Sequence, residues 1–356
     1  MDIAHRLSGN YDISVLHPAE IAPFPFNLMK KYRNLAGKEP WDDNGIKVTP
    51  FRYLRIFGQK QAFRLLHCYR DKMIKMAREA DVQLVHAHYA LPDGLIAYEI
   101  HKALGIPYVI SFRKSDMKYL QLKNCSTRRL IEETLANASQ IIAHNAAQRD
   151  LLAQAGFQSV IVPHGVENDF LKPKENKDVL KDITIASVGE LVPPKHIDWV
   201  VEAVKNYKGD KSITLKITGE GPMRKDLEMM ADGAENICFL GKIAHDEVGK
   251  LLEESTIFAL PSVNETFGLV FMEAAAHQNA VIATKGTGIW GVFEDKKEMF
   301  YCDSQQSFND MLYQLIDNDE FRNEMAMKAY EKTARDFTWD KIISRYSEIY
   351  KKSLNH

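Results

Sequence analysis

The sequence predicts an α/β protein with two doubly wound, parallel-sheet domains. Short β-branched runs alternate with longer amphipathic stretches through most of the 356 residues, a pattern that indicates parallel strands joined by crossover helices. The chain is long for a single hydrophobic core. A charged, proline-containing segment without periodicity, residues 167–182, separates two groups of five strand-like runs, so we expect it to be a linker.

The predicted elements follow one another in regular order. The first group of strands is ISVLHP (13–18), VQLVHAHY (82–89), PYVISF (107–112), QIIAHN (140–145) and SVIVPHG (159–165). The second is ITIASVG (183–189), SITLKITG (212–219), NICFLG (236–241), STIFALP (255–261) and NAVIAT (279–284). Helices are expected at 95–104, 128–137, 198–206, 246–254 and 268–278. These elements predict an N-terminal domain of residues 1–166 and a C-terminal domain of residues 183–337.

The last segment, residues 338–356, has apolar residues at helical spacing. Docking this predicted helix on the first domain is one way to bury its apolar stripe. At the other end, residues 2–8 look like the end of a helix whose preceding strand and tight loop are absent. We therefore expect the chain to lack the first strand of its first domain.

Composition excludes several classes of protein. No apolar run approaches the roughly 18 residues that a membrane-spanning helix needs, and the first residues contain no apolar signal core. The four cysteines share no close spacing, which fits a cytoplasmic protein better than a disulfide or zinc framework. Residues 1–167 contain 22 Lys and Arg against 16 Asp and Glu, and the remainder 24 against 32. The basic half could meet an anionic partner, or its surface could simply be unevenly charged.

The segment NETFGLVFMEAA, residues 264–275, places two glutamates eight positions apart. A buried strand precedes it and a helix begins near Gly268, so free N–H groups at the helix start could bind a phosphate. Glu265 lies before the helix and Glu273 lies inside it, roughly 7–8 Å further along the axis. The two carboxylates could hold hydroxyls on either side of that phosphate, or could be solvated acids of a capped helix.

Two other strand ends have similar features. In SVGELVPPKHIDW a strand ends at Gly189, and Lys195 stands just before the next helix, where it could bind a diphosphate. In ITGEGP a strand ends at Gly219 in a Gly-x-Gly turn, which alone is a poor nucleotide signal.

In this order and spacing, VGELVPPK, ITGEGP, LPSVNETFGLVFMEA and AVIAT closely resemble the nucleotide-sugar half of retaining glycosyltransferases of the family 4 group. HAHYALPDGLIAY, LGIPYVISFRKSD and VPHGV resemble their first half. The resemblance covers nearly the whole chain. It implies the GT-B fold, in which two Rossmann-like domains face each other across a cleft.

The resemblance also implies roles for individual residues. Glu273 would hold the ribose hydroxyls of the donor nucleotide, and Glu265 would contact hydroxyls of the donor sugar. Lys195 would neutralise the departing diphosphate. The remaining donor-binding positions are Gly189, Gly219, Phe267, Gly268 and Leu269. No cofactor or metal is implied, because the departing phosphate can accept the proton of the acceptor hydroxyl.

The sequence departs from the family pattern at several points. Glu190 stands where an arginine is usual, and GTGIWG (286–291) lacks the usual glutamate of a Gly-Gly-x-Pro-Glu segment. Arg113 and Lys114 replace a His-Gly pair, which puts a fixed positive charge near the reacting sugar and makes Arg113 a catalytic candidate. The usual Gly-rich first loop would lie before Met1.

The acceptor-side candidates are His88, Asp93 and Asp116, which lie in the motifs of the first half. His86 and His88 alternate along one strand face, but without a third ligand they favour a strand end at the cleft over a metal site. Residues 51–78 carry eight Lys and Arg among apolar residues. This stretch could contact anionic lipid at the inner membrane face, or could be a solvated helix packed on the core. No nucleic-acid recognition motif accompanies the charge.

These observations predict a cytoplasmic, metal-independent retaining glycosyltransferase. It would transfer a sugar from a nucleotide-diphosphate donor to a glycan or lipid-linked glycan, in assembly of a cell-surface polysaccharide such as capsule or lipopolysaccharide. The alternative is a catalytically impaired GT-B scaffold that binds nucleotide or a partner. A sugar-nucleotide epimerase, which shares the fold, is a third possibility that the motif set disfavours.

Overall fold

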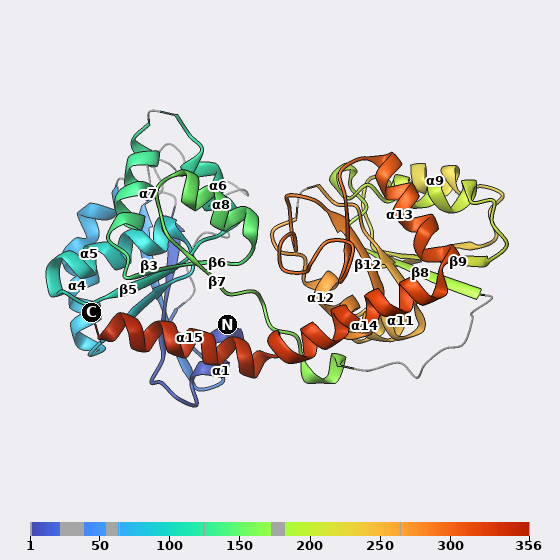
Figure 1. Cartoon of the computed structure of the whole chain (residues 1–356). Coiled ribbons are helices and arrows are strands. Elements are labelled where there is room, and N and C mark those ends of the chain that lie inside the picture. Colours follow the sequence, from blue (N-terminus) through green and yellow to red (C-terminus); the bar gives the residue numbers. More distant parts are fainter. Residues whose placement is uncertain are drawn as a thin grey trace. The chain divides into compact units, whose positions relative to one another are not determined.

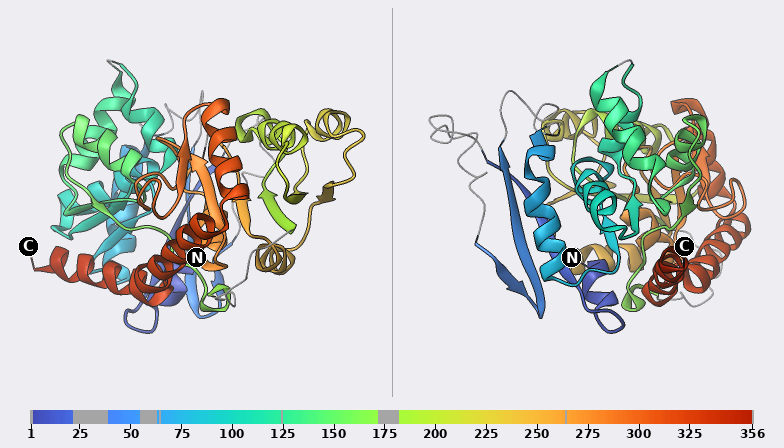
Figure 2. Two further views of the ribbon diagram at one scale, coloured as in Figure 1. Left: turned by 45° about the vertical axis from the view of Figure 1, so that its right-hand side comes forward. Right: turned by 90° about the vertical axis from the view of Figure 1, so that its left-hand side faces the viewer.

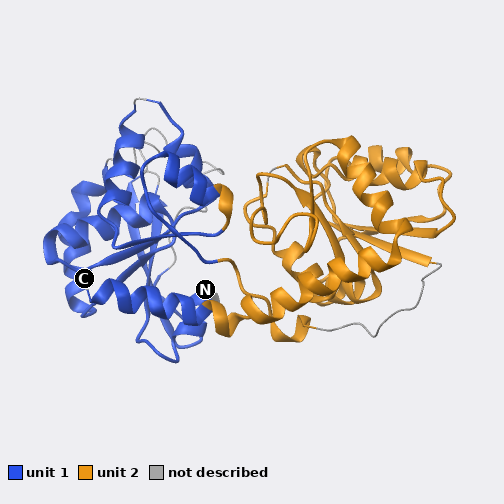
Figure 3. Ribbon diagram, viewed as in Figure 1, with its two compact units in different colours: residues 1–144, 148–162, 343–356 blue, residues 145–147, 163–342 orange. Residues whose placement is uncertain are grey.

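The computed structural model describes residues 2–21, 39–54, 63, 65–123, 125–171, 182–263 and 265–355. The chain divides into two compact units (Figure 3). The first comprises residues 1–144, 148–162 and 343–356, and the second comprises residues 145–147 and 163–342. Most of the expected linker lies outside the described residues. The domain limits expected from the sequence, 1–166 and 183–337, stay a prediction.

The first unit contains a four-stranded parallel sheet in the order β4-β5-β6-β7. Its strands are β4 (Val85–Ala87), β5 (Tyr108–Ser111), β6 (Gln140–Ala143) and β7 (Val160–Ile161). The helices near it are α1 (Asp2–Leu7), α4 (Arg70–Glu79), α5 (Leu95–Leu104), α6 (Lys114–Leu120), α7 (Ser126–Ala136) and α8 (Ala146–Gln154), as Figure 1 shows. Aromatic and branched side chains from the strands and helices form a continuous buried core, as expected where helices cover a parallel sheet.

The first predicted strand does not join this sheet. It forms β1 (Ser14–Ile21), which pairs in parallel with β3 (Ile46–Leu54), and β3 also pairs with β2 (Trp41–Asp43). The prediction of five strands in one series was therefore wrong for this unit. Asn44 and Gly45 join β2 to β3 with positive φ values of 49° and 89°, and Asn-Gly is a strong hairpin signal.

The basic stretch 51–78 is split between β3 and α4, with residues 55–62 and 64 outside the described part. Figure 2 (right) shows α4 beside the long strands of the three-stranded sheet. Met73 and Ala77 of α4 are buried in the core, and the Lys72 ammonium lies 5.2 Å from the ring centroid of Phe51. One face of α4 is therefore packed on the core, and contact of its exposed face with anionic lipid stays a prediction.

The second unit contains a six-stranded parallel sheet in the order β10-β9-β8-β11-β12-β13. Its strands are β8 (Asp182–Val188), β9 (Ser212–Thr218), β10 (Ile237–Gly241), β11 (Ile257–Ala259), β12 (Ala280–Thr284) and β13 (Phe300–Cys302). Its helices are α9 (Ile197–Asn206), α10 (Arg224–Met230), α11 (His245–Glu254), α12 (Leu269–Ala276), α13 (Gln305–Asp317) and α14 (Asp319–Asp336). The order is that of a doubly wound fold. All strands of this sheet except the three-residue β13 were predicted, whereas the helices α10, α13 and α14 were not.

The last helix is α15 (Trp339–Leu354), and its residues from 343 onward belong to the first unit. Its apolar stripe is buried, as the exposures of Ile342, Tyr346, Ile349 and Tyr350 show. In the described part of the chain, no helix combines the length and the apolar character that crossing a membrane requires.

Candidate active site

The second sheet reverses its direction of growth between β8 and β11. From β8 the chain adds β9 and β10 on one side, and from β11 it adds β12 and β13 on the other. The carboxyl ends of the two strands at such a switch point border the region where open α/β sheets bind ligands. The loops that follow β8 and β11 contain Lys195 and Glu265.

Lys195 and Glu265 contact each other directly. The Nζ atom of Lys195 donates to Oε1 of Glu265, and these side chains expose only 21% and 13% of their surface. The backbones of the two loops also meet, since the N–H of Val263 donates to the carbonyl of Pro194 at 2.9 Å. The structure therefore brings together two charged residues that the sequence assigned to the same ligand.

A third loop, after β12, supports Glu265 from another side. The hydroxyl of Thr287 lies 3.2 Å from both the backbone N–H and the carbonyl oxygen of Glu265, accepting from the former and donating to the latter. A Cβ atom on Gly288 would lie 2.8 Å from the Cβ of Glu265, so glycine permits this close approach. Sequence reasoning missed Thr287, because a hydroxyl that bonds a distant backbone follows no spacing rule.

Gly268 starts α12 with a left-handed backbone at φ 82°. A Cβ there would lie 2.5 Å from the ring of Phe271. The preceding Phe267 is buried and packs edge-on against His164, with ring centroids 5.2 Å apart, so it can offer a ligand only main-chain groups. Leu269 begins the helix, where backbone N–H groups lack intrahelical partners.

Glu273 lies further along α12 and exposes 15% of its side chain. The Nε2 atom of His245 is 3.7 Å from its carboxylate. Burial raises the pKa of Glu273, and the charge on His245 partly offsets that rise. His245 was not identified from the sequence, since a lone histidine carries no spacing signal.

The glycines after β8 and β9 pack backbone against backbone. Gly219 has φ 138°, and a Cβ there would lie 1.8 Å from the carbonyl oxygen of Gly189. A Cβ on Gly189 itself would make only ordinary contact, 3.7 Å from the methylenes of Lys195. Close backbone packing explains why residue 219 is a glycine. Contact of Gly189 and Gly219 with a donor stays a prediction.

In the first unit, Arg113 follows β5 and contacts His88, which follows β4. The Nε atom of Arg113 donates to the backbone carbonyl of His88 at 3.3 Å, and its Nη2 atom lies 3.5 Å from the Nδ1 atom of His88. Because β4 and β5 are parallel neighbours, both residues lie at the carboxyl edge of this sheet.

The two acids predicted on the acceptor side lie beside this pair. Asp116 is fully buried and accepts from the backbone N–H groups of Arg113 at 2.8 Å, Ala90 at 3.1 Å and Leu91 at 3.4 Å. Burial raises the pKa of Asp116 to about 6 in spite of these bonds. Burial, with the nearby charge of Asp116, raises the pKa of Asp93 to about 7. Asp116 braces the loop after β4, and direct contact of either acid with an acceptor stays a prediction.

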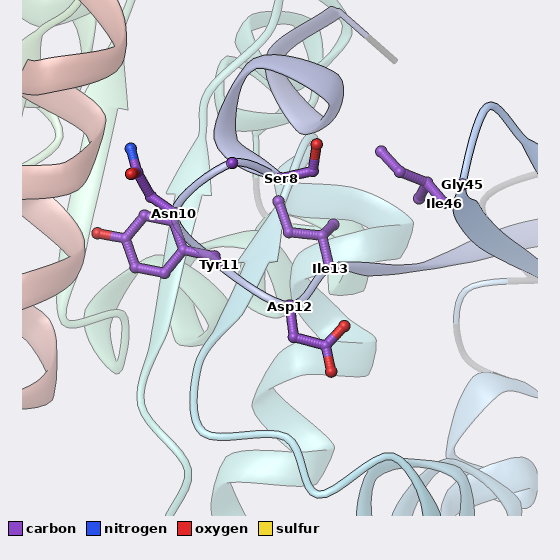
Figure 4. A pocket seen from close by; sticks show the side chains of 8 residues that line it. Ser8, Asn10, Tyr11, Asp12, Ile13, Gly45 and Ile46 are labelled. Atoms are coloured by element: carbon purple, nitrogen blue, oxygen red, sulfur yellow. The ribbon is translucent and has the colours of Figure 1, made fainter.

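A polar hollow of about 430 Å³ lies elsewhere in the first unit, between the segment after α1 and the β2–β3 hairpin (Figure 4). It is lined by Ser8, Gly9, Asn10, Tyr11, Asp12, Ile13, Gly45 and Ile46, and none of the predicted site residues is among them.

Within the described ranges, no three His, Cys, Asp or Glu residues are grouped to hold a metal ion. His86 and His88 stack ring on ring, with centroids 4.4 Å apart.

Two α/β units, each built on a parallel sheet and the second with a switch point that carries charged side chains, are the architecture of the GT-B class of glycosyltransferases. Solved structures of this class share the fold. Sucrose-phosphate synthase from Thermosynechococcus elongatus matches with a TM-score of 0.72 and 15% identity, over 99% of this chain and 91% of that one. HepE from Anabaena, solved with UDP, matches with a TM-score of 0.69 and 16% identity, over 95% and 99%.

The chain belongs to the glycosyltransferases of group 1, family 4. The family model for glycosyl transferases group 1 matches residues 168–332, and the model for glycosyltransferase family 4 matches residues 2–170. The resemblance and fold class expected from the sequence are thereby confirmed, and the protein is a glycosyltransferase.

Two relatives illustrate the group. The putative teichuronic acid biosynthesis glycosyltransferase TuaC of Bacillus subtilis is 24% identical over 362 residues, which cover 96% of this chain and 91% of TuaC. The N-acetyl-alpha-D-glucosaminyl L-malate synthase of Bacillus anthracis is 24% identical over 297 residues, covering 79% and 77%.

Proposed function

We propose that this glycosyltransferase transfers a sugar from a nucleotide-diphosphate donor to a hydroxyl of a glycan or lipid-linked glycan, with retention of the anomeric configuration. The Lys195–Glu265 pair at the switch point is the observation that carries the proposal. TuaC is named for teichuronic acid biosynthesis, and HepE has been solved with UDP-glucose. The name of TuaC supports a role in polysaccharide biosynthesis, and the HepE complex supports a nucleotide-sugar donor.

Donor binding would use the charged pair and α12 together. The diphosphate would lie against Lys195 and the N–H groups at the start of α12, which favour anions. Glu265, freed from Lys195, would accept hydrogen bonds from hydroxyls of the sugar. Glu273, nearer the middle of the helix, would accept them from the ribose.

Bond cleavage would then increase the negative charge on the departing diphosphate. Lys195 stands at the switch point before the donor binds, paired with Glu265 and with most of its side chain buried. A preorganised charge of this kind lowers the barrier by several kcal/mol. The departing phosphate oxygen would take the proton of the acceptor hydroxyl, so neither a carboxylate base nor a metal ion is required.

The first unit would supply the acceptor side. Arg113 is held by His88, and Asp116 fixes the loop that carries both. A guanidinium fixed at this edge can stabilise charge near the reacting sugar. Asp93 would accept a hydrogen bond from the acceptor or donate one, since its pKa of about 7 leaves both forms populated near neutral pH.

A screen of nucleotide sugars by thermal shift would identify the donor. Incubating that donor with candidate glycan acceptors, and reading the linkage of the product by NMR, tests the reaction. A product with inverted configuration contradicts retention, and loss of activity with a chelator contradicts metal independence. Donor binding with neither transfer nor nucleotide release would instead favour the impaired scaffold.

We also propose that α4 brings the protein to an anionic membrane surface from the cytoplasmic side. Lys75 and Arg78 of this helix are exposed, while Met73 and Ala77 are buried in the core. Any attraction to lipid would therefore be mainly electrostatic and sensitive to salt. Sedimentation with vesicles of phosphatidylglycerol, against vesicles of phosphatidylcholine, tests this. The Lys75→Glu, Arg78→Glu variant should lose the binding, and binding equal to both lipids would contradict the proposal.

A further inference from the structure

The His86 ring is held between two hydroxyl groups in the first unit. Its Nδ1 atom lies 2.6 Å from the hydroxyl of Tyr350 on α15, and its Nε2 atom lies 2.8 Å from the hydroxyl of Ser111 at the end of β5. The ring of Tyr346, one helical turn before Tyr350, lies 5.6 Å from the His86 ring, centroid to centroid. Both tyrosines and Ser111 are buried, so water does not compete for these bonds.

The same ring is linked to the predicted acceptor side. The His86 and His88 rings stack at 4.4 Å with an angle of 28° between their planes. His88 in turn contacts the guanidinium of Arg113 through its backbone carbonyl and its Nδ1 atom. A continuous series of contacts therefore runs from Tyr350 to Arg113.

The imidazole of His86 is neutral, and each of its two ring nitrogens needs a hydrogen-bond partner. Burial lowers the pKa of His86 well below its ordinary value, and His88, Arg113 and His144 lower it further. A neutral ring has one N–H donor and one acceptor nitrogen, and the two hydroxyls can satisfy one each. Removing one hydroxyl would leave one nitrogen of the half-buried ring without its protein partner. The ring would then turn or shift to find another.

We propose that Tyr350 is a positioning residue for sugar transfer, which fixes the His86 ring and, through the stacked His88, the guanidinium of Arg113. This inference rests on the proposed function of Arg113. It adds that the C-terminal helix does more than cover the core of the first unit, because one hydroxyl of that helix sets the geometry at the carboxyl ends of β4 and β5.

The Tyr350→Phe variant of the full chain tests the proposal, because it removes the hydroxyl and keeps the ring packed on Tyr11. We expect kcat/KM for the acceptor to fall about tenfold, with donor affinity by calorimetry changed less than about twofold. Ser353→Ala is the matched control. Ser353 is also buried on α15, and its hydroxyl donates to the Ile349 carbonyl of its own helix. This variant should therefore lower Tm similarly without changing acceptor kinetics.

A double-mutant cycle with Arg113→Lys separates positioning from general destabilisation. If Tyr350 acts through Arg113, adding Tyr350→Phe to Arg113→Lys should lower acceptor kcat/KM by less than about twofold more. Full additivity, or an unchanged acceptor kcat/KM in Tyr350→Phe alone, overturns the proposal. Failure of the wild-type protein to bind or turn over any nucleotide sugar would instead refute the proposed function, so the two failures are distinguishable.

Discussion

The Nζ atom of Lys195 donates a hydrogen bond to Oε1 of Glu265, although the two residues follow different strands of the second sheet. Each charge is neutralised by the other while no ligand is present. Both side chains are mostly buried, and the hydroxyl of Thr287 bonds the backbone of Glu265. An incoming diphosphate would replace Glu265 as the partner of Lys195, which leaves the carboxylate available to the sugar.

We expect Lys195→Ala to reduce kcat about 100-fold and donor affinity less than about fivefold, since the charge that Lys195 stabilises grows during bond cleavage. Steady-state kinetics and calorimetry measure the two effects. Lys285→Ala is the control, because Lys285 follows β12 and contacts the ring of Trp290 instead. An unaffected kcat in Lys195→Ala would remove the residue from the reaction.

Glu273→Ala should weaken nucleotide binding about tenfold or more, because a carboxylate that accepts two ribose hydroxyls makes charge-assisted bonds. In the wild-type protein, affinity should fall as the pH drops through the raised pKa of Glu273, since protonation removes that charge. His245→Ala removes the nearby positive charge, so the loss should begin at a higher pH. Calorimetric titrations across pH measure this, and equal affinity in Glu273→Ala would refute the ribose assignment.

Gly219→Ala should destabilise the second unit by several kcal/mol, since its Cβ would lie 1.8 Å from a backbone oxygen that cannot move aside. Gly189→Ala, in the adjoining loop, should cost less than about 1 kcal/mol of stability because its Cβ would make ordinary contacts. Urea denaturation compares the pair. Similar unfolding midpoints for the two variants would contradict the backbone packing described for these loops.

The pKa of Asp93 is raised from 3.8 to about 7 in the folded protein. The stability that protonated Asp93 gives is therefore full below about pH 4 and is lost as the pH rises through 7. Asp93→Asn should raise Tm at pH 8 by roughly 2–8 °C, for about 1–2 kcal/mol, and change it little near pH 4. The exposed Asp12, replaced by Asn, is the control. A pH-independent difference between Asp93→Asn and wild type would exclude the raised pKa.

Much of the fold could be predicted because parallel strands are buried on both faces and therefore appear as apolar runs. The hairpin of β2 and β3 was not predicted, although Asn44 and Gly45 mark its turn, because β2 is only three residues long. The three-residue β13 is too short to leave a pattern. Of the site, Glu265 and Lys195 were found from motifs, but their contact depends on strand order, which a linear sequence does not state. The network of Tyr350, His86 and Arg113 depends on the placement of α15, and no local signal marks it.

The closing residues of the chain, 343–356, are part of the first compact unit. The ribosome therefore releases the last piece of that unit only after the whole second sheet has been made. Residues 163–342, by contrast, leave the ribosome as one uninterrupted stretch. A chain truncated before residue 343 should show protease resistance in the later unit, while the earlier unit, without the buried stripe of α15, stays open to cleavage.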